Sequence, residues 1–178
     1  MALILGAMAL VAVACGSTTK PTTATTAGQG QDVNVRVFFT PDSGGPDCSE
    51  TTPVDRTVQA PEDLLSAALT ELLAGPTTTE RDAGLRSWFS ADTADSLLSA
   101  TIVDGTAHID FKDFSSQLGG ASSSCGSSQL LNQLDSTARQ FPTVERTLYS
   151  FNGNVEAFYS WLQRVPPDYY TPTSSTTP

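Results

Sequence analysis

Cysteine and histidine side chains carry the most reactive chemistry in this sequence, which has three cysteines and one histidine. A cysteine beside a histidine can act as a nucleophile with its general base, so Cys125 and His108 could serve an envelope hydrolase. Two cysteines outside the cytoplasm instead tend to oxidise to a disulfide. Cys48 and Cys125 both lie in Gly/Ser-rich stretches, where a covalent link would hold loops together. We predict this disulfide, and the hydrolase that uses Cys125 and His108 remains the alternative.

The third cysteine follows a hydrophobic segment near the start of the chain. Residues 2–14 form an uncharged run of 13 mostly apolar residues, whereas a helix that crosses a bilayer needs about 20. The run therefore fits the hydrophobic region of a secretory signal peptide. Ala12 and Ala14, directly before Cys15, resemble the bacterial lipobox. We predict that residues 1–14 are a lipoprotein signal peptide and that lipid, including palmitate, on Cys15 anchors the protein to the outer face of the cytoplasmic membrane.

Two polar stretches flank the remaining sequence. Residues 15–31 are rich in Thr and Gly, and residues 166–178 are rich in Pro, Thr and Ser. Segments of this composition bury too little apolar surface to offset chain entropy, so we predict a disordered tether and a disordered tail. Residues 32–165 then form one domain, because their number suits a single hydrophobic core.

The charge balance argues against a nucleic-acid partner. The chain has 9 Lys and Arg against 19 Asp and Glu, which gives a formal net charge of −10. Binding to phosphates needs clustered basic residues, and here the basic residues are scattered singly between Lys20 and Arg164.

Hydrophobic periodicity predicts a mixture of strands and helices between the two polar stretches. Alternating apolar residues from Val33 to Phe39 indicate a strand with one buried face, and leucines at helical spacing after Pro61 indicate an amphipathic helix. We predict an α+β fold, a small and mostly antiparallel sheet with two helices packed on one face. The predicted elements, in the order strand, helix, hairpin, helix, strand and short C-terminal helix, are 33–40, 61–74, 97–111, 126–141, 144–151 and 155–163.

The hairpin is the clearest local pattern. Asp104-Gly105 separates two runs of β-forming residues and suits a two-residue turn. That turn sets the register and places the apolar pairs on one face of the hairpin. The predicted pairs are Val103 with Thr106, Ile102 with Ala107, Ala100 with Ile109 and Leu98 with Phe111, while Thr101 meets His108 and Ser99 meets Asp110 on the opposite face.

Two interpretations of the C-terminal helix stay open. Val155, Phe158 and Leu162 share one helical face, with Trp161 beside them. This helix could simply pack on the sheet. Because aromatic residues dominate the energetics of protein interfaces, Phe158, Trp161 and Leu162 are also a candidate partner surface.

Several short motifs occur together in the chain. They are Leu72-Leu73-Ala74-Gly75-Pro76, Gly84-Leu85, the hairpin around Asp104-Gly105, Gln140-Phe141-Pro142-Thr143-Val144 and Asn152-Gly153. Over residues 64–153 the sequence resembles the GerMN domain family of sporulation and spore germination, which is also common in actinobacterial envelope lipoproteins. The resemblance implies a compact α/β module outside the cytoplasmic membrane, without known catalytic residues. Relatives with a sporulation role often carry tandem copies, whereas this chain has one, so the resemblance does not extend to the building of rings.

The sequence contains few other patterns that indicate chemistry. It has no Gly-x-Ser-x-Gly elbow, phosphate-binding loop or paired-histidine motif, and we expect neither a metal nor another cofactor. A lone His108 near Asp110 is typical of a solvated pair across two strands. We therefore expect a non-catalytic envelope protein that binds an unknown protein or peptidoglycan partner near the membrane.

Overall fold

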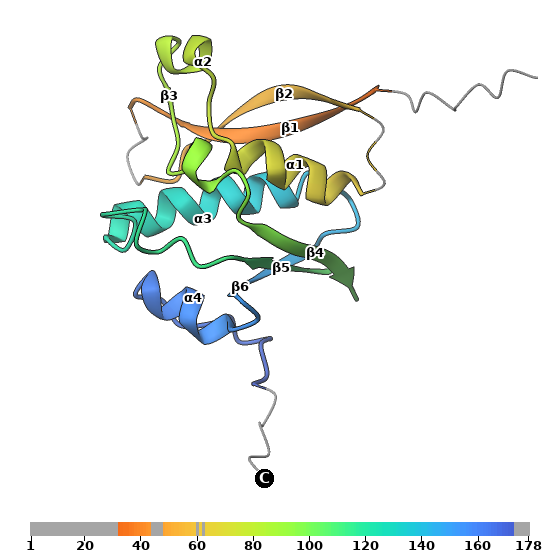
Figure 1. Ribbon diagram of the computed structural model, residues 1–178. Coiled ribbons are helices and arrows are strands. Elements are labelled where there is room, and N and C mark those ends of the chain that lie inside the picture. Colours follow the sequence, from red (N-terminus) through yellow and green to blue (C-terminus); the bar gives the residue numbers. More distant parts are fainter. Residues whose placement is uncertain (1–31, 44–47, 60, 62, 173–178) are drawn as a thin grey trace, which may run out of the picture.

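The computed structural model describes residues 32–43, 48–59, 61 and 63–172, and these form two small sheets with helices between them (Figure 1). The first sheet has the strand order β2-β1-β3. Its strands are β1 (Asp32–Pro41), β2 (Thr52–Gln59) and β3 (Leu85–Arg86). The second sheet has the order β4-β5-β6, with β4 (Leu97–Val103), β5 (Thr106–Phe111) and β6 (Arg146–Phe151).

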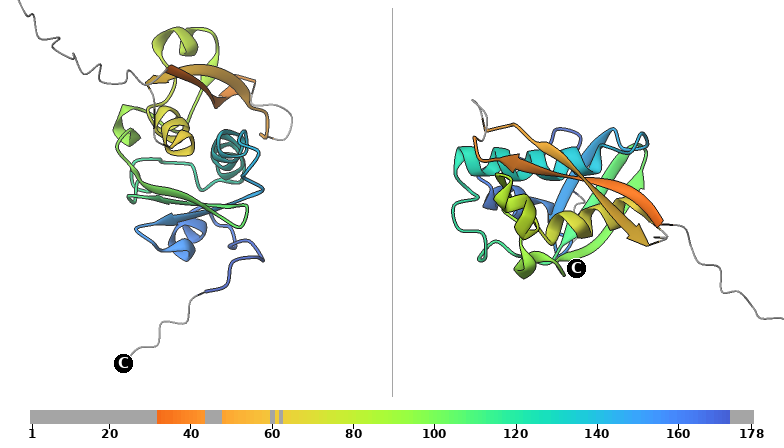
Figure 2. Two further views of the ribbon diagram at one scale, coloured as in Figure 1. Left: turned by 90° about the vertical axis from the view of Figure 1, so that its right-hand side faces the viewer. Right: turned by 90° about the horizontal axis from the view of Figure 1, so that it is seen from above.

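The two long helices, α1 (Leu64–Leu73) and α3 (Ser124–Ala138), form a layer between the sheets. Figure 2 shows them side by side, with the first sheet on one side and the second sheet on the other. The short helix α2 (Thr78–Asp82) and a single 3-10 turn at Ala91–Thr93 lie in the connection from α1 to β4. The last helix, α4 (Val155–Trp161), packs against β6.

The α+β class is confirmed, and three of the four strand pairings are antiparallel as predicted, but the strands form two sheets rather than one. Strand β1 pairs only with β2 and β3 in antiparallel fashion, and β5 pairs with β6 in parallel. The parallel pair follows from the connection between the two strands. Helix α3 carries the chain from the C-terminal end of β5 back to the end of the sheet at which β5 starts, so β6 runs in the same direction as β5. The alternating apolar residues of β1 indicated that one face of the strand is buried, but they did not indicate which strands lie beside it.

The hairpin prediction is confirmed except at its far end. Asp104 and Gly105 both have positive φ, as a type I′ turn requires, and the pairs from Val103–Thr106 to Ser99–Asp110 have the predicted register. A bulge between Leu97 and Ser99 then pairs Leu97, rather than Leu98, with Phe111. Leu98 is the extra residue of the bulge and is 46% exposed.

Helix α1 begins and ends for identifiable local reasons. It starts at Leu64 rather than at residue 61, because the carboxylate of Asp63 accepts hydrogen bonds from the backbone N–H groups of Leu65 and Ser66. Its apolar face is buried, namely Leu65, Ala68, Leu69, Leu72 and Leu73. The chain leaves the helix at Gly75, whose φ is +76°. A Cβ atom there would overlap the carbonyl oxygen of Phe89, so the motif ending in Gly75-Pro76 reflects close backbone packing.

Helix α3 starts two residues earlier and ends three residues earlier than predicted. The Ser123 hydroxyl caps it by accepting a hydrogen bond from the N–H of Gly126, and the helix ends at Ala138 rather than continuing to Phe141. Phe141 still packs against the core, but from the loop that leads to β6. Cys125 thus lies in the first turn of a helix and not in an irregular loop.

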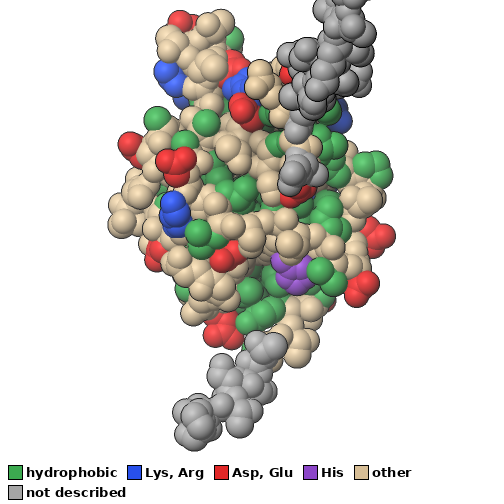
Figure 3. Space-filling model, turned by 45° about the vertical axis from the view of Figure 1, so that its right-hand side comes forward, with side chains coloured by type: hydrophobic (Ala, Val, Ile, Leu, Met, Phe, Trp, Pro, Cys, Tyr) green, Lys and Arg blue, Asp and Glu red, His purple; other side chains and the backbone are tan. Residues whose placement is uncertain are grey.

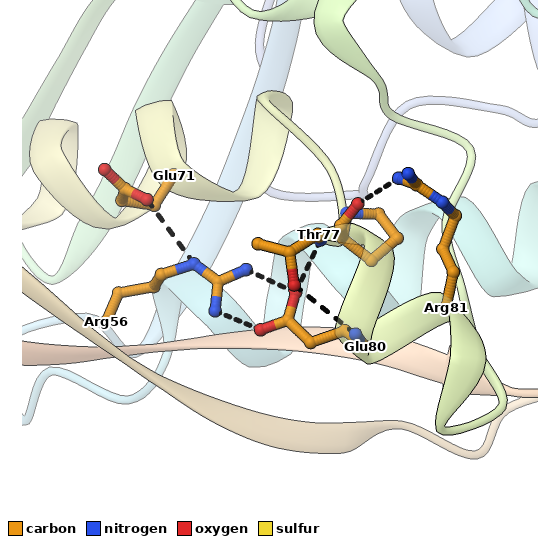
Figure 4. A network of polar contacts seen from close by, with 6 residues as sticks. Arg56, Glu71, Thr77, Glu80 and Arg81 are labelled. Carbon is orange, nitrogen blue, oxygen red and sulfur yellow. Dashed lines mark hydrogen bonds and ion pairs between the residues drawn. The ribbon is translucent and has the colours of Figure 1, made fainter.

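A group of ion pairs attaches α2 and α1 to the first sheet (Figure 4). Arg56 of β2 donates through both terminal nitrogens to the carboxylate of Glu80, with one bond of 2.7 Å, and its Nε lies 3.4 Å from Glu71. Glu80 also accepts from the backbone N–H of Thr77 at 2.7 Å, which completes a capping box. The hydrogen bond from Arg56 lowers the pKa of Glu80 below its usual range, so the charged pair persists at a lower pH than an unpaired glutamate would allow.

We predict that Gly75→Ala destabilises the protein by about 2 to 4 kcal/mol, because it combines an unfavourable positive φ with a backbone overlap. Gly153→Ala is the matched control, since Gly153 has a φ of +80° but open space where a Cβ would lie. Its expected cost is about 1 kcal/mol. Urea unfolding of both variants measures the difference, and equal costs would show that the close approach to Phe89 is unimportant.

Candidate functional site

A groove with a volume of about 440 Å³ lies on the second sheet, and we take it as the candidate functional site. Its floor is formed by alternate residues of two neighbouring strands, Thr106 and His108 of β5 and Arg146 and Leu148 of β6. Tyr169 and Tyr170, from the segment after α4, line one side. Below, "the groove" means these six residues and the space between them.

The register of the parallel strands places these side chains together. Thr106 pairs with Arg146, and His108 pairs with Leu148, so the four residues share one face. The intervening residue Thr147 points the other way, because its hydroxyl donates to Asp135 of α3 at 2.7 Å. The groove therefore lies on the face of the second sheet that is turned away from the helical layer.

The segment after α4 is ordered along this face, which corrects the prediction that the domain ends at residue 165. The hydroxyl of Tyr169 donates to the carbonyl oxygen of Thr147 at 2.6 Å, and the guanidinium of Arg146 lies 5.1 Å from the centre of the Tyr169 ring. Tyr170 packs against the main core. The tail predicted from residue 166 thus contributes one wall of the groove, while residues 173–178 lie outside the described residues.

The Tyr169 hydroxyl is protonated at neutral pH and serves as a donor to Thr147, and partial burial raises its pKa above the usual value of 10. His108 and Arg146 are exposed. The groove thus combines aromatic faces, a cation and an imidazole with the apolar side chain of Leu148. These are groups that hold a ligand in place, and in the part of the chain that the structure describes no three His, Cys, Asp or Glu side chains cluster as a metal site.

Cys48 and Cys125 are joined by a disulfide, with Cα atoms 5.4 Å apart, which links the start of α3 to the loop between β1 and β2. The Cys125 sulfur is therefore engaged and is not a thiolate nucleophile in this structure. His108 lies in the groove, whose lining does not include Cys125. The structure does not bring the two residues of the hydrolase alternative together.

The candidate partner surface on α4 is not available as predicted. Phe158 is 0% exposed and Leu162 is 1% exposed, so both belong to the core. Trp161 is partly buried and packs on the rings of Phe114 and Phe151, with centroids 5.8 and 5.3 Å away. The simpler interpretation, a short helix packing on the sheet, describes these three residues.

Sequence reasoning missed the groove because its floor and its side come from distant parts of the chain. Thr106 and Arg146 lie 40 residues apart, and their pairing depends on the parallel strands. The adjacent aromatic residues Tyr169 and Tyr170, inside a stretch otherwise rich in Pro and Thr, were the available signal. Cys15 lies outside the described residues, as do residues 1–14 and the whole of the predicted tether.

Comparisons with known proteins point to one domain family. A family model described as "Germane: Sporulation and spore germination" matches residues 36–156. The tandem GerMN domains of the sporulation protein GerM from Bacillus subtilis are 23% identical, with a TM-score of 0.50 over 73% of this chain. This chain covers only 43% of that tandem structure. A search of the curated proteins found no match.

Two further solved structures have lower scores. The first GerMN domain of the same GerM protein is 19% identical, with a TM-score of 0.46 over 69% of this chain and 85% of the other. A candidate lipoprotein from Clostridium perfringens is 19% identical, with a TM-score of 0.40 over 69% of this chain and 76% of the other.

We predict that the purified, secreted domain has no free thiol until it is reduced. Cys125→Ser should then lower the free energy of unfolding by about 4 to 5 kcal/mol, because the disulfide closes a long loop across a sequence separation of 77. Thiol titration before and after reduction, followed by urea unfolding, measures both effects. A reactive thiol in the unreduced protein would revive the Cys125 hydrolase.

Proposed function

The chain belongs to the Germane family of sporulation and spore germination domains, and on that premise we propose that it is a non-catalytic envelope protein that binds a partner near the membrane. The partner is a protein or the peptidoglycan wall, and lipid on Cys15 holds the domain at the outer face of the cytoplasmic membrane. The actinobacterial origin suggested by the resemblance stays a prediction. The groove is the observation that carries this proposal.

The position of the groove supports partner binding at a distance from the anchor. The described chain begins at Asp32 in β1 of the first sheet, and Figure 2 shows the second sheet on the other side of the helical layer. The groove lies on the face of the second sheet that is turned away from that layer. The helical layer thus separates the end that would be tethered from the face that would meet a partner. Figure 3 shows hydrophobic side chains beside the histidine on this surface.

The proposed anchor rests on residues 2–15 of the sequence alone. Within the described residues, no helix has both the length and the apolar character needed to cross a membrane. With lipid on Cys15, 16 residues separate the anchor from Asp32, and a flexible chain of that length spans roughly 20 to 25 Å. The domain would then stay close to the bilayer while it turns toward a partner.

Membrane fractionation tests the anchor. In cells that express the full chain, Cys15→Ala should move the protein from the membrane fraction to the medium, or leave it as an unprocessed precursor. Cys48→Ser is the matched control, because it removes a cysteine that the proposal assigns to the disulfide, and its product should stay with the membrane. Lipidation of Cys15 is wrong if the Cys15→Ala protein still sediments with the membrane in mature form.

Photo-crosslinking from the groove tests partner binding. A photoreactive phenylalanine analogue at His108, which is exposed on the groove floor, should trap a product in intact cells. The same analogue at Thr57, which is exposed on β2 of the other sheet, should not trap that product. Digestion of the product with a muramidase separates a peptidoglycan partner from a protein partner. Identical products, or none, from the two positions would contradict a binding role for the groove.

A further inference from the structure

The edges of the two sheets differ in how they are protected. An exposed edge strand offers unpaired backbone groups, and natural sheets usually block it with charge, proline or a covering segment. In the first sheet, β3 has only two residues, and β2 carries Pro53, Asp55 and Arg56. In the second sheet, Tyr169 lies over the β6 edge and donates to the carbonyl oxygen of Thr147.

Strand β4 forms the remaining edge, and among the described residues no covering segment is hydrogen-bonded to its regular part. From Leu98 to Val103 it contains no charged residue and no proline. Three of its apolar side chains are well exposed, at 46% for Leu98, 39% for Ile102 and 55% for Val103. The bulge at Leu98 limits regular pairing to the residues after it, from Ser99 to Val103.

The hairpin register identifies the backbone groups that face outward from β4. Val103 and Thr106 flank the two-residue turn and exchange hydrogen bonds, so the bonds to β5 are made by every second residue back from Val103. The N–H and C=O groups of Ala100 and Ile102 therefore point to the free edge. Among the described residues, no partner is recorded for these two donors and two acceptors.

Charge at the two ends of this strand favours a basic partner. Asp92 and Asp95 precede it, and Asp104 and Glu145 lie at the hairpin turn, where Glu145 reaches to within about 3 Å of the position that a Gly105 Cβ would take. Among the described residues, no ion pair is recorded for any of these four carboxylates. A second copy pairing antiparallel would bring Asp95 of one chain near Asp104 of the other, which is unfavourable.

We propose that the β4 edge is the docking site for an extended segment of another envelope protein, which adds to the second sheet as a fourth strand. The segment has an uncharged, β-branched centre and a Lys or Arg at each end. A peptide backbone matches the outward groups of Ala100 and Ile102, and the flanking basic residues match the carboxylates at the strand ends. This inference rests on the proposed function, because it names a protein as the partner and strand addition as the mode.

Synthetic peptides test the inference directly on the full-length chain. The probe is a fluorescein-labelled peptide of alternating Thr and Val with Lys at both ends. The control peptide has the same centre and label but carries Glu at both ends. Fluorescence anisotropy should show the Lys-ended peptide binding about tenfold more tightly, with the difference shrinking at high salt. Equal affinities, or no binding of either peptide, would overturn the proposal.

Substitutions on β4 locate the binding. Thr101→Lys adds a positive charge to an exposed strand position and should lower the affinity for the Lys-ended peptide about fivefold. Thr57→Lys makes the same change on the β2 edge and should leave the affinity unaltered. Ile102→Pro removes one outward N–H without removing a bond to β5 and should weaken binding about tenfold. Equal effects of Thr101→Lys and Thr57→Lys would assign the binding elsewhere.

Sedimentation distinguishes a segment of another protein at the β4 edge from a second copy of this chain. We expect the full-length chain to be monomeric, and a dimer that Thr101→Lys dissociates would assign the edge to self-association and overturn the proposal. The proposed function has its own tests, because the peptide experiment depends neither on the anchor nor on the groove. If groove crosslinks form while the peptides fail to bind, the strand-addition inference alone is wrong.

Discussion

Helix α3 is hydrogen-bonded to both sheets, and the arrangement of the molecule depends on this double attachment. Gln133 donates to a β1 hydroxyl at 2.8 Å and Thr137 accepts from a β1 backbone N–H at 3.2 Å. Asp135 accepts from Thr147 of β6 at 2.7 Å. Residues four apart share one helix face, whereas a residue midway between them lies on the opposite face. A single helix can therefore satisfy polar groups on two sheets at once.

The core of the described residues lies around this central layer. The inner faces of both sheets and the apolar face of α1 are buried against one another, and the aromatic residues of α4 complete the core at the end near β6. A cluster of rings, Phe111, Phe114, Phe151 and Phe158, lies where the β strands meet α4. A groove on an outer face and the edge of strand β4 are two of the exposed features outside this core, and both suit binding.

The elements that the sequence predicted well are those governed by neighbouring residues. Asp104-Gly105 determined a turn and, with it, five pairs of the hairpin register. The Leu-rich face of α1 and its end at Gly75 were equally visible, although the capping by Asp63 moved the start of the helix. The features that the sequence left open involved distant partners, such as the parallel pairing of β6 and the choice between burial and exposure of Phe158. The groove was missed for the same reason, since Tyr169 reaches it only through a hydrogen bond to β6.

From the sequence alone follow the element types, the acidic character, the family resemblance and the expectation of an exported, lipid-bearing chain, because these depend on local composition and short motifs. The tertiary structure decided which strands share a sheet, which face of the second sheet is exposed and that its β4 edge is unpaired among the described residues. Those properties depend on contacts between residues far apart in the chain, and periodicity within a strand reports that a face is buried without reporting what buries it. The groove and the β4 edge therefore became visible only when the two sheets were assembled around α3.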